Sequence, residues 1–142
     1  MDKNLAPKAN VPQFCDIVVA TKCVLKCRMC RAWQCGENAD EITFEEAKRF
    51  VSGLSEFVKF PLEINVMGGE PFLKDWCLDL CNFIHENGFK SIISTNACLI
   101  DEDMAKKIAD SKLSVLAISL ESLKAQTHDF YRGVDGTFAK VM

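Results

Sequence analysis

Residues 16–30 read DIVVATKCVLKCRMC, a short apolar run followed at once by three cysteines with the spacing CxxxCxxC. The apolar run, Asp16–Ala20, is short and rich in β-branched residues, which is typical of a buried strand. Similar runs occur at 62–67, 91–95 and 114–120, and each is followed by a segment with helical periodicity. Four strands that alternate with helices predict a parallel sheet in an α/β fold.

The helical segments carry recognisable start and stop signals. Residues 43–46 (TFEE) form a capping box for the first helix, which should end before Pro61. The second should run from about Lys74 to the Asn87-Gly88 pair, and Asp101 should cap the third. Because helices would cover strands that are apolar on both faces, two architectures stay open: an open doubly wound sheet and part of a barrel.

Composition and charge narrow the classes of function. The chain has 142 residues, of which 49% are hydrophobic, so we expect one domain with a real core. A formal charge of -3 without any Lys/Arg block argues against nucleic acid as a partner. No apolar run reaches the ~20 residues of a membrane span, and residues 1–13 form a leader without a secretory signal. We therefore expect a cytoplasmic protein whose domain occupies residues 14–142.

The cysteine cluster is the strongest chemical signal. Because cytoplasmic thiols stay reduced, clustered cysteines indicate metal binding or catalysis rather than disulfides. Cys23, Cys27 and Cys30 supply three thiolates, which suit zinc or an iron–sulfur cluster and leave one coordination position open. An open position is typical of catalysis. The alternative is a structural zinc site that adds Cys35 as the fourth ligand and has no open position.

The other unusual residues follow the remaining strands. Gly68-Gly-Glu-Pro71 comes after the second strand, Thr95-Asn96 ends the third, and Ser119–Ser122 (SLES) ends the fourth. Both architectures place their chemistry in the loops at the carboxyl ends of the strands. The sequence therefore predicts that four separate loops contribute to a single site.

CVLKCRMC at 23–30, together with GGEP at 68–71, resembles the radical S-adenosylmethionine (radical SAM) superfamily. The similarity continues through STNA (94–97), ISLES (118–122) and THDFYRGVDGTF (127–138), and so covers nearly all of residues 14–142. The family's fold is a parallel partial (β/α) barrel of six βα units. Since only about four units are counted here, the resemblance implies the amino-terminal portion of the catalytic domain, incomplete at its C-terminus.

The resemblance also implies cofactors and their ligands. Cys23, Cys27 and Cys30 would hold a [4Fe-4S] cluster, and S-adenosylmethionine would bind the fourth iron. The S-adenosylmethionine-binding residues would be Met29, Gly68, Gly69, Glu70, Thr95, Asn96, Ser119, Glu121 and Arg132. Met29 stands where the family often has an aromatic residue beside the adenine. The two glycines would let the backbone approach the methionine amine, with Glu70 shaping the turn.

The chemistry implied by the resemblance is reductive cleavage of S-adenosylmethionine to a 5′-deoxyadenosyl radical, which abstracts hydrogen from a substrate. Protein atoms would mainly orient and shield the cofactors. A peptide or protein is the suggested substrate, and a flavodoxin- or ferredoxin-like protein the suggested electron donor. The other functional class left open is a non-catalytic fragment that holds a metal or a cluster.

His128 and the strand at 114–120 are two further features of the sequence. His128 either belongs to the resemblance or is a surface residue at the start of a helix. The strand at 114–120 contains neither charge nor proline at its centre to discourage pairing with another chain, so we expect self-association through an open sheet edge.

Overall fold

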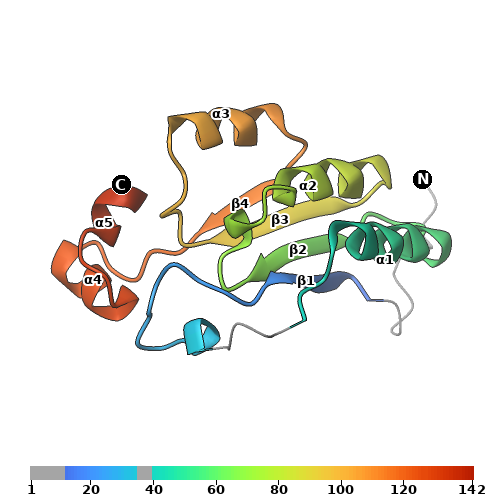
Figure 1. Cartoon of the computed structure of the whole chain (residues 1–142). Coiled ribbons are helices and arrows are strands. Elements are labelled where there is room, and N and C mark those ends of the chain that lie inside the picture. Colours follow the sequence, from blue (N-terminus) through green and yellow to red (C-terminus); the bar gives the residue numbers. More distant parts are fainter. Residues whose placement is uncertain (1–11, 35–39) are drawn as a thin grey trace, which may run out of the picture.

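A computed structural model describes residues 12–34 and 40–142, and its four parallel strands form one sheet (Figure 1). They are β1 (Phe14–Ala20), β2 (Glu63–Gly68), β3 (Lys90–Thr95) and β4 (Val115–Ile118), in the order β1-β2-β3-β4. The predicted parallel sheet is confirmed, although β1 starts two residues earlier than expected and β4 is shorter. Residues 1–11 of the predicted leader and Cys35 lie outside the described residues.

The predicted helices are present with the predicted caps. They are α1 (Phe44–Phe57), α2 (Cys77–Glu86) and α3 (Glu102–Asp110), and α4 (Ala125–Arg132) and α5 (Thr137–Val141) follow β4. Short 3-10 turns occupy Ala32–Gln34 (η1) and Pro71–Leu73 (η2), and α2 starts at Cys77, later than the predicted start near Lys74. The Thr43–Glu46 capping box is formed on both sides, and Asp101 accepts a hydrogen bond from the Met104 N–H.

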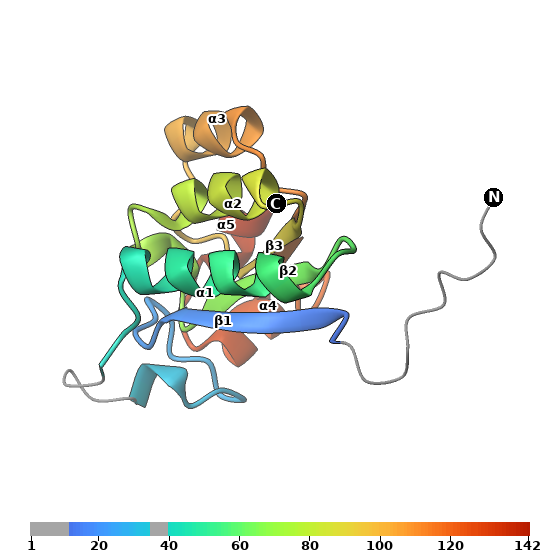
Figure 2. The same ribbon diagram turned by 90° about the vertical axis from the view of Figure 1, so that its right-hand side faces the viewer.

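Helices α1, α2 and α3 lie side by side on the same face of the sheet (Figures 1 and 2). The central strand residues on that face are fully buried, as Val19, Ile64 and Ile93 illustrate with 0% exposure. A doubly wound sheet has helices on both faces, whereas a barrel carries its helices on the outside only. Sequential strand order and one-sided helices therefore select the partial barrel from the two architectures.

The opposite face, called the inner face below, is covered by no helix of residues 12–34 and 40–142. It is partly polar, so the expectation that the strands are apolar on both faces was wrong. Polar side chains are tolerated there because only the helix-covered face has to exclude water. From β1 to β4 its residues are Phe14, Asp16, Val18, Glu63, Asn65, Met67, Lys90, Ile92, Ser94, Val115 and Ala117.

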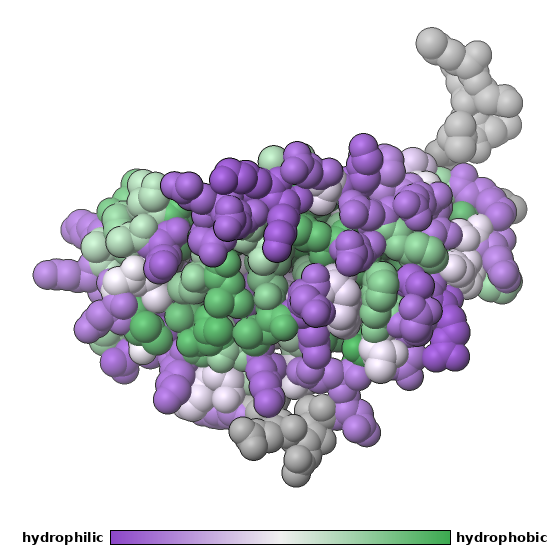
Figure 3. Space-filling view, turned by 45° about the horizontal axis from the view of Figure 1, so that its top comes forward, coloured by the Kyte–Doolittle hydropathy of each residue, from purple (hydrophilic) through white to green (hydrophobic). Residues whose placement is uncertain are grey.

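The remaining features of the fold are its surface and the edge of its sheet at β4. Much of the surface visible in Figure 3 is hydrophilic, and hydrophobic side chains form a patch left of the centre of that view, with others toward both ends. In the described part of the chain, β4 pairs with β3 alone, and Val115 and Ile118 are 49% and 44% exposed. No helix found in the described ranges is both long enough and apolar enough to cross a membrane.

Candidate functional site

The carboxyl ends of the strands open into a pocket of about 240 Å³. It is lined by the three predicted cysteine ligands and by most of the predicted cofactor-binding residues, namely Met29, Gly68, Gly69, Thr95, Asn96, Ser119, Glu121 and Arg132. Met67 and Ser94, the first residue of the STNA stretch, also line the pocket, although neither was among the predicted binding residues. Each occupies the last inner-face position of its strand. Counting every second residue along the strands would have identified both positions.

The cysteine loop, Thr21–Gln34, is held against the end of β2 by backbone contacts. Gly69 donates its N–H to the Ala20 carbonyl at 2.8 Å, and Glu70 donates to the Lys22 carbonyl at 2.9 Å. A Cβ on Gly68 would lie 2.1 Å from the Ala20 oxygen, and one on Gly69 would lie 2.1 Å from the Lys22 oxygen. The glycine pair is thus required by the protein's own backbone packing, a reason that sequence reasoning about the cofactor did not supply.

The end of α4 holds the same loop from another side. Arg28 donates its backbone N–H to the Tyr131 carbonyl and its Nε–H to the Phe130 carbonyl, both at 2.9 Å. Its guanidinium also lies 4.1 Å from the centre of the Phe130 ring. Gly133 has φ +72°, and a Cβ there would lie 2.2 Å from the Lys26 carbonyl oxygen. The THDFYRG segment therefore shapes the cysteine loop directly.

A carboxylate holds the N-terminal end of the cysteine loop by hydrogen bonds. Glu41 Oε1 accepts hydrogen bonds from the backbone N–H of Thr21 at 2.5 Å and from its hydroxyl at 2.7 Å, while Oε2 pairs with Lys74. The Lys74 hydrogen bond, followed by those from Thr21, lowers the pKa of Glu41 to about 2. This residue was missed by sequence reasoning, because nothing local marks a contact that spans 20 residues.

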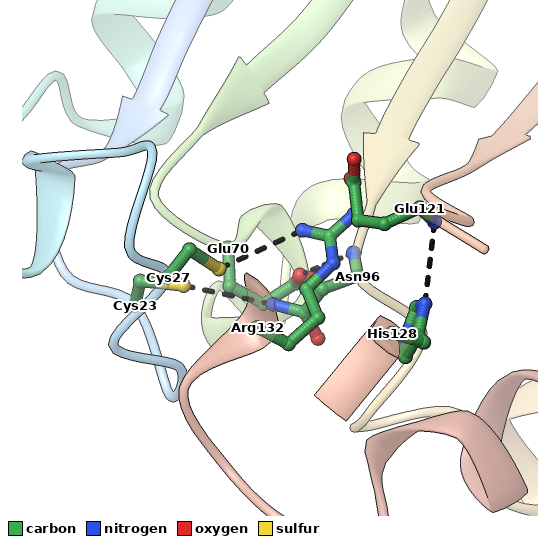
Figure 4. Close-up of polar contacts among 7 residues, drawn as sticks. All are labelled: Cys23, Cys27, Glu70, Asn96, Glu121, His128 and Arg132. Atoms are coloured by element: carbon green, nitrogen blue, oxygen red, sulfur yellow. Dashed lines mark hydrogen bonds and ion pairs between the residues drawn. The ribbon is translucent and has the colours of Figure 1, made fainter. Parts of the chain in front are cut away.

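Two of the thiols receive hydrogen bonds from nitrogen donors. Cys23 Sγ accepts from the Leu25 N–H at 3.4 Å and from Asn96 Nδ2 at 3.6 Å, and Cys30 Sγ accepts from the Ala32 N–H at 3.4 Å (Figure 4 draws the Asn96 contact). Burial is the main cause that raises the pKa of Cys23, and the Leu25 hydrogen bond opposes it. Such N–H donors stabilise a thiolate and influence a bound metal.

The third thiol, that of Cys27, receives a hydrogen bond from Arg132, which is only 8% exposed. Its Nη1 donates to Cys27 Sγ at 3.6 Å and its Nη2 pairs with Glu121 Oε1 at 2.7 Å (Figure 4). Glu121 is itself fixed by its backbone N–H, which donates to Nδ1 of His128. His128 is 1% exposed and lies within α4, so the interpretation of it as a surface residue was wrong.

Glu70 does not line the pocket. It is 0% exposed and accepts hydrogen bonds from the Thr95 hydroxyl at 2.7 Å, the Asn96 N–H at 2.9 Å and the Phe72 N–H at 3.3 Å. Its carboxylate therefore joins the turn after β2 to the end of β3. Glu70 thus positions Thr95 and Asn96, which line the pocket.

The three thiols that line the pocket are a donor set that an iron–sulfur cluster can take. Within residues 12–34 and 40–142, no three Cys, His, Asp or Glu side chains converge on one metal position. A zinc ion needs four ligands at about 2.0–2.3 Å, whereas each thiolate of a cubane bonds to a different iron. Arg132 Nε is buried without a hydrogen-bond partner among the described residues, so the pocket wall has a donor to spare for an anionic group.

Comparisons with known proteins agree with this geometry. A sequence model described as the Radical SAM superfamily matches residues 17–142. The Fe-coproporphyrin III synthase of Methanosarcina barkeri is 36% identical over 118 residues, covering 82% of this chain and 29% of that protein. The AdoMet-dependent heme synthase of the same organism is 28% identical over 134 residues, covering 94% of this chain and 38% of that protein.

A solved structure shows the same fold. The crystal structure of Streptococcus suis SuiB bound to its precursor peptide SuiA superposes with a TM-score of 0.73 at 25% identity. The match covers 87% of this chain and 28% of SuiB. The chain thus spans roughly a third of the length of its relatives.

Proposed function

The chain belongs to the radical SAM superfamily, and from this premise we propose that it is the cofactor-binding front part of a radical SAM enzyme. The superfamily uses a [4Fe-4S] cluster and S-adenosylmethionine, as the sequence motifs predicted. Because the matched relatives are about three times as long, the activity, the substrate and the partners of the protein are all part of the proposal.

In this proposal Cys23, Cys27 and Cys30 hold the cluster. When bound and reduced, such a cluster would supply one electron to break the bond between the sulfonium and C5′ of S-adenosylmethionine, giving methionine and a 5′-deoxyadenosyl radical that would abstract a hydrogen atom from the substrate. The single observation that carries the proposal is the pocket itself, because it gathers all three thiols with residues from the ends of β2, β3 and β4.

The chain's own residues position and screen the cofactors. Arg132 and Asn96 donate to two of the thiolates and so offset the negative charge of the cluster. Glu121 fixes the guanidinium of Arg132, whose Nε–H has no partner in the described part of the chain and is suited to the carboxylate of S-adenosylmethionine. Met29 is 53% exposed at the pocket edge, where its thioether would make a soft apolar contact with the adenine.

The proposed substrate is a peptide or protein. The supporting observation is the likeness to SuiB, which was solved with a precursor peptide bound. A small flavodoxin- or ferredoxin-like protein is proposed as the electron donor, because a reductive cleavage needs a one-electron source.

Anaerobic reconstitution with iron and sulfide, followed by electron paramagnetic resonance of the reduced protein, tests the proposal. We expect a cubane signal that changes shape when S-adenosylmethionine is added and is lost in Cys27→Ala. Cys98→Ala is the matched control, since Cys98 is half-buried nearby but does not line the pocket. Tight binding of one zinc ion per chain without any cluster would support the four-thiolate alternative and refute the proposal.

A further inference from the structure

A row of hydrogen-bonded polar side chains crosses the inner face beside the pocket. Ser94 on β3 donates its hydroxyl proton to Asn65 Oδ1 at 3.0 Å, and Asn65 on β2 donates from Nδ2 to Asp16 Oδ1 on β1 at 2.8 Å. Asn65 is only 8% exposed, and Asp16 is exposed. The row therefore runs from the pocket wall, where Ser94 lies, to an open carboxylate at the far side of the sheet.

The direction of the hydrogen bonds determines what the row can bind. Both hydrogen bonds of the row run toward Asp16, so the groups at its two ends can accept further hydrogen bonds. At one end Ser94 lines the pocket, and at the other Asp16 forms no ion pair with any described residue. A ligand that uses both ends must bring N–H or O–H donors, and a cation is preferred at Asp16.

The neighbours of Asp16 indicate the shape of that cation. Phe14 and Val18 occupy the flanking positions on the same face and are 48% and 53% exposed. A carboxylate between two exposed apolar side chains suits a charged head on a methylene stem, as in lysine and arginine. A hydrated inorganic ion gains nothing from the apolar surface.

We propose that the inner face beside the pocket is a substrate subsite, in which Asp16 binds an ammonium or guanidinium group of a peptide. The inference rests on the proposed function, since it assumes that the reacting carbon lies over the pocket. Neighbouring strands are about 4.8 Å apart, so a row that reaches from β3 to β1 places this charge on the order of 10 Å from the reacting carbon. Asp16 would thus help to choose which residue of the substrate is presented.

Titration with two matched peptides tests the subsite. Acetyl-glycyl-lysyl-glycinamide carries the cation, and its norleucine analogue has the same stem without charge. Binding is followed by backbone amide shifts of β1 to β3 in the reconstituted protein with S-adenosylmethionine. We expect the lysine peptide to bind at least tenfold more tightly than the norleucine peptide, and Asp16→Asn to remove that preference. Asparagine keeps the shape of the side chain and an acceptor for Asn65, so the fold should be unaffected, which circular dichroism can check.

Glu63→Gln is the control variant, because it removes the same charge from the same face. Glu63 is exposed at the opposite end of β2, in register with Lys90 and away from the pocket. It should change the affinity for the lysine peptide less than twofold. Equal affinities for the two peptides, or an Asp16→Asn protein that keeps the lysine preference, would refute the subsite.

The same samples separate this inference from the proposed function. The inner face is built by the sheet, so the titration is repeated on cluster-free protein and gives an answer whether or not iron is incorporated. A lysine preference in a protein that cannot be reconstituted with any cluster would leave the cation site at Asp16 standing and overturn the radical chemistry. A cluster that responds to S-adenosylmethionine, in a protein indifferent to the charge at Asp16, would do the reverse.

Discussion

The two faces of the sheet are built to different requirements. On the helix-covered face, Val19, Ile64, Val66 and Ile93 are all 0% exposed. On the inner face the same strands present half-exposed apolar side chains and a row of polar ones. Burial of apolar surface stabilises a protein by about 25 cal/mol per Å², so the helix-covered face supplies most of the stability. The inner face contributes less to stability, so its side chains can be of the kinds that a ligand requires.

The loops around the pocket differ from both faces. They are held by single polar contacts and by close backbone approaches rather than by a packed core. Such contacts give a fixed geometry at a small net gain in free energy, which is what a binding site needs. The four predictions below test these differences between the two faces and the loops, beginning with the largest expected effect.

The helix-covered face should be the more sensitive of the two to truncation. Ile64→Ala removes a fully buried side chain and leaves a cavity, so it should lower the free energy of unfolding by about 2–5 kcal/mol. Val18→Ala on the inner face removes a side chain that is 53% exposed and should cost less than about 1 kcal/mol. Urea unfolding followed by circular dichroism measures both. Equal losses would contradict the comparison between the faces.

The close approach between β2 and the cysteine loop should tolerate no side chain. Gly68→Ala would place a Cβ 2.1 Å from the Ala20 oxygen at a φ of +150°, so it should cost at least about 2 kcal/mol and impair cluster binding. Gly53→Ala in α1 is the control, since nothing lies within 4 Å of its Cβ position, and it should stabilise the helix by roughly 0.5–1 kcal/mol. Thermal unfolding and iron content give the two readouts. A Gly68→Ala protein with normal iron content would show that the contact is dispensable.

The Glu41 contacts should make the loop sensitive to acid. Because the folded-state pKa of Glu41 is lowered to about 2, its contribution is fully present above the ordinary carboxyl pKa of about 4.3 and is lost as the pH falls toward 2. Glu41→Gln should therefore lower stability by on the order of 1 kcal/mol at pH 7, and the difference from the unmodified protein should shrink as the pH decreases. Urea unfolding between pH 7 and pH 2.5 measures it. A difference that is independent of pH would assign the effect to packing instead.

The smallest effect on stability is expected at the sheet edge. Val115 is 49% exposed on β4, so Val115→Lys should change the free energy of unfolding by no more than about 0.5 kcal/mol. A lysine on an open edge discourages strand pairing between chains, and self-association should decrease. Sedimentation velocity over a range of concentrations compares the two proteins. If the unmodified protein is a dispersed monomer throughout, the predicted edge association is wrong.

Local signals in the sequence were sufficient for the elements and for most of the pocket. Short apolar runs rich in β-branched residues located the strands, and the capping signals at Thr43 and Asp101 located two helix starts to the residue. The cysteine triplet and the GGEP turn could be assigned to one site because parallel strands bring their carboxyl ends together.

Contacts between distant residues could not be read in this way. Glu41 with Lys74, Asp16 with Asn65, and the buried position of His128 depend on which strands and loops become neighbours. Period-two counting places Asp16 on the inner face, but it cannot show that no helix of the described chain covers that face. The reason for the glycine pair was also missed, since a clash between two backbones becomes visible only when both are in place.

The contact between Arg132 and Cys27 joins residues 105 positions apart. During synthesis, the cysteine loop leaves the ribosome long before α4 is made. At that stage Arg28 cannot yet bond to the end of α4, and the close approach of Gly133 to the loop is also missing. The thiols are then exposed to oxidation and to adventitious metals. Cluster insertion is expected to follow the docking of α4, which makes the order of assembly, and not the cysteine motif alone, a determinant of which metal the protein acquires.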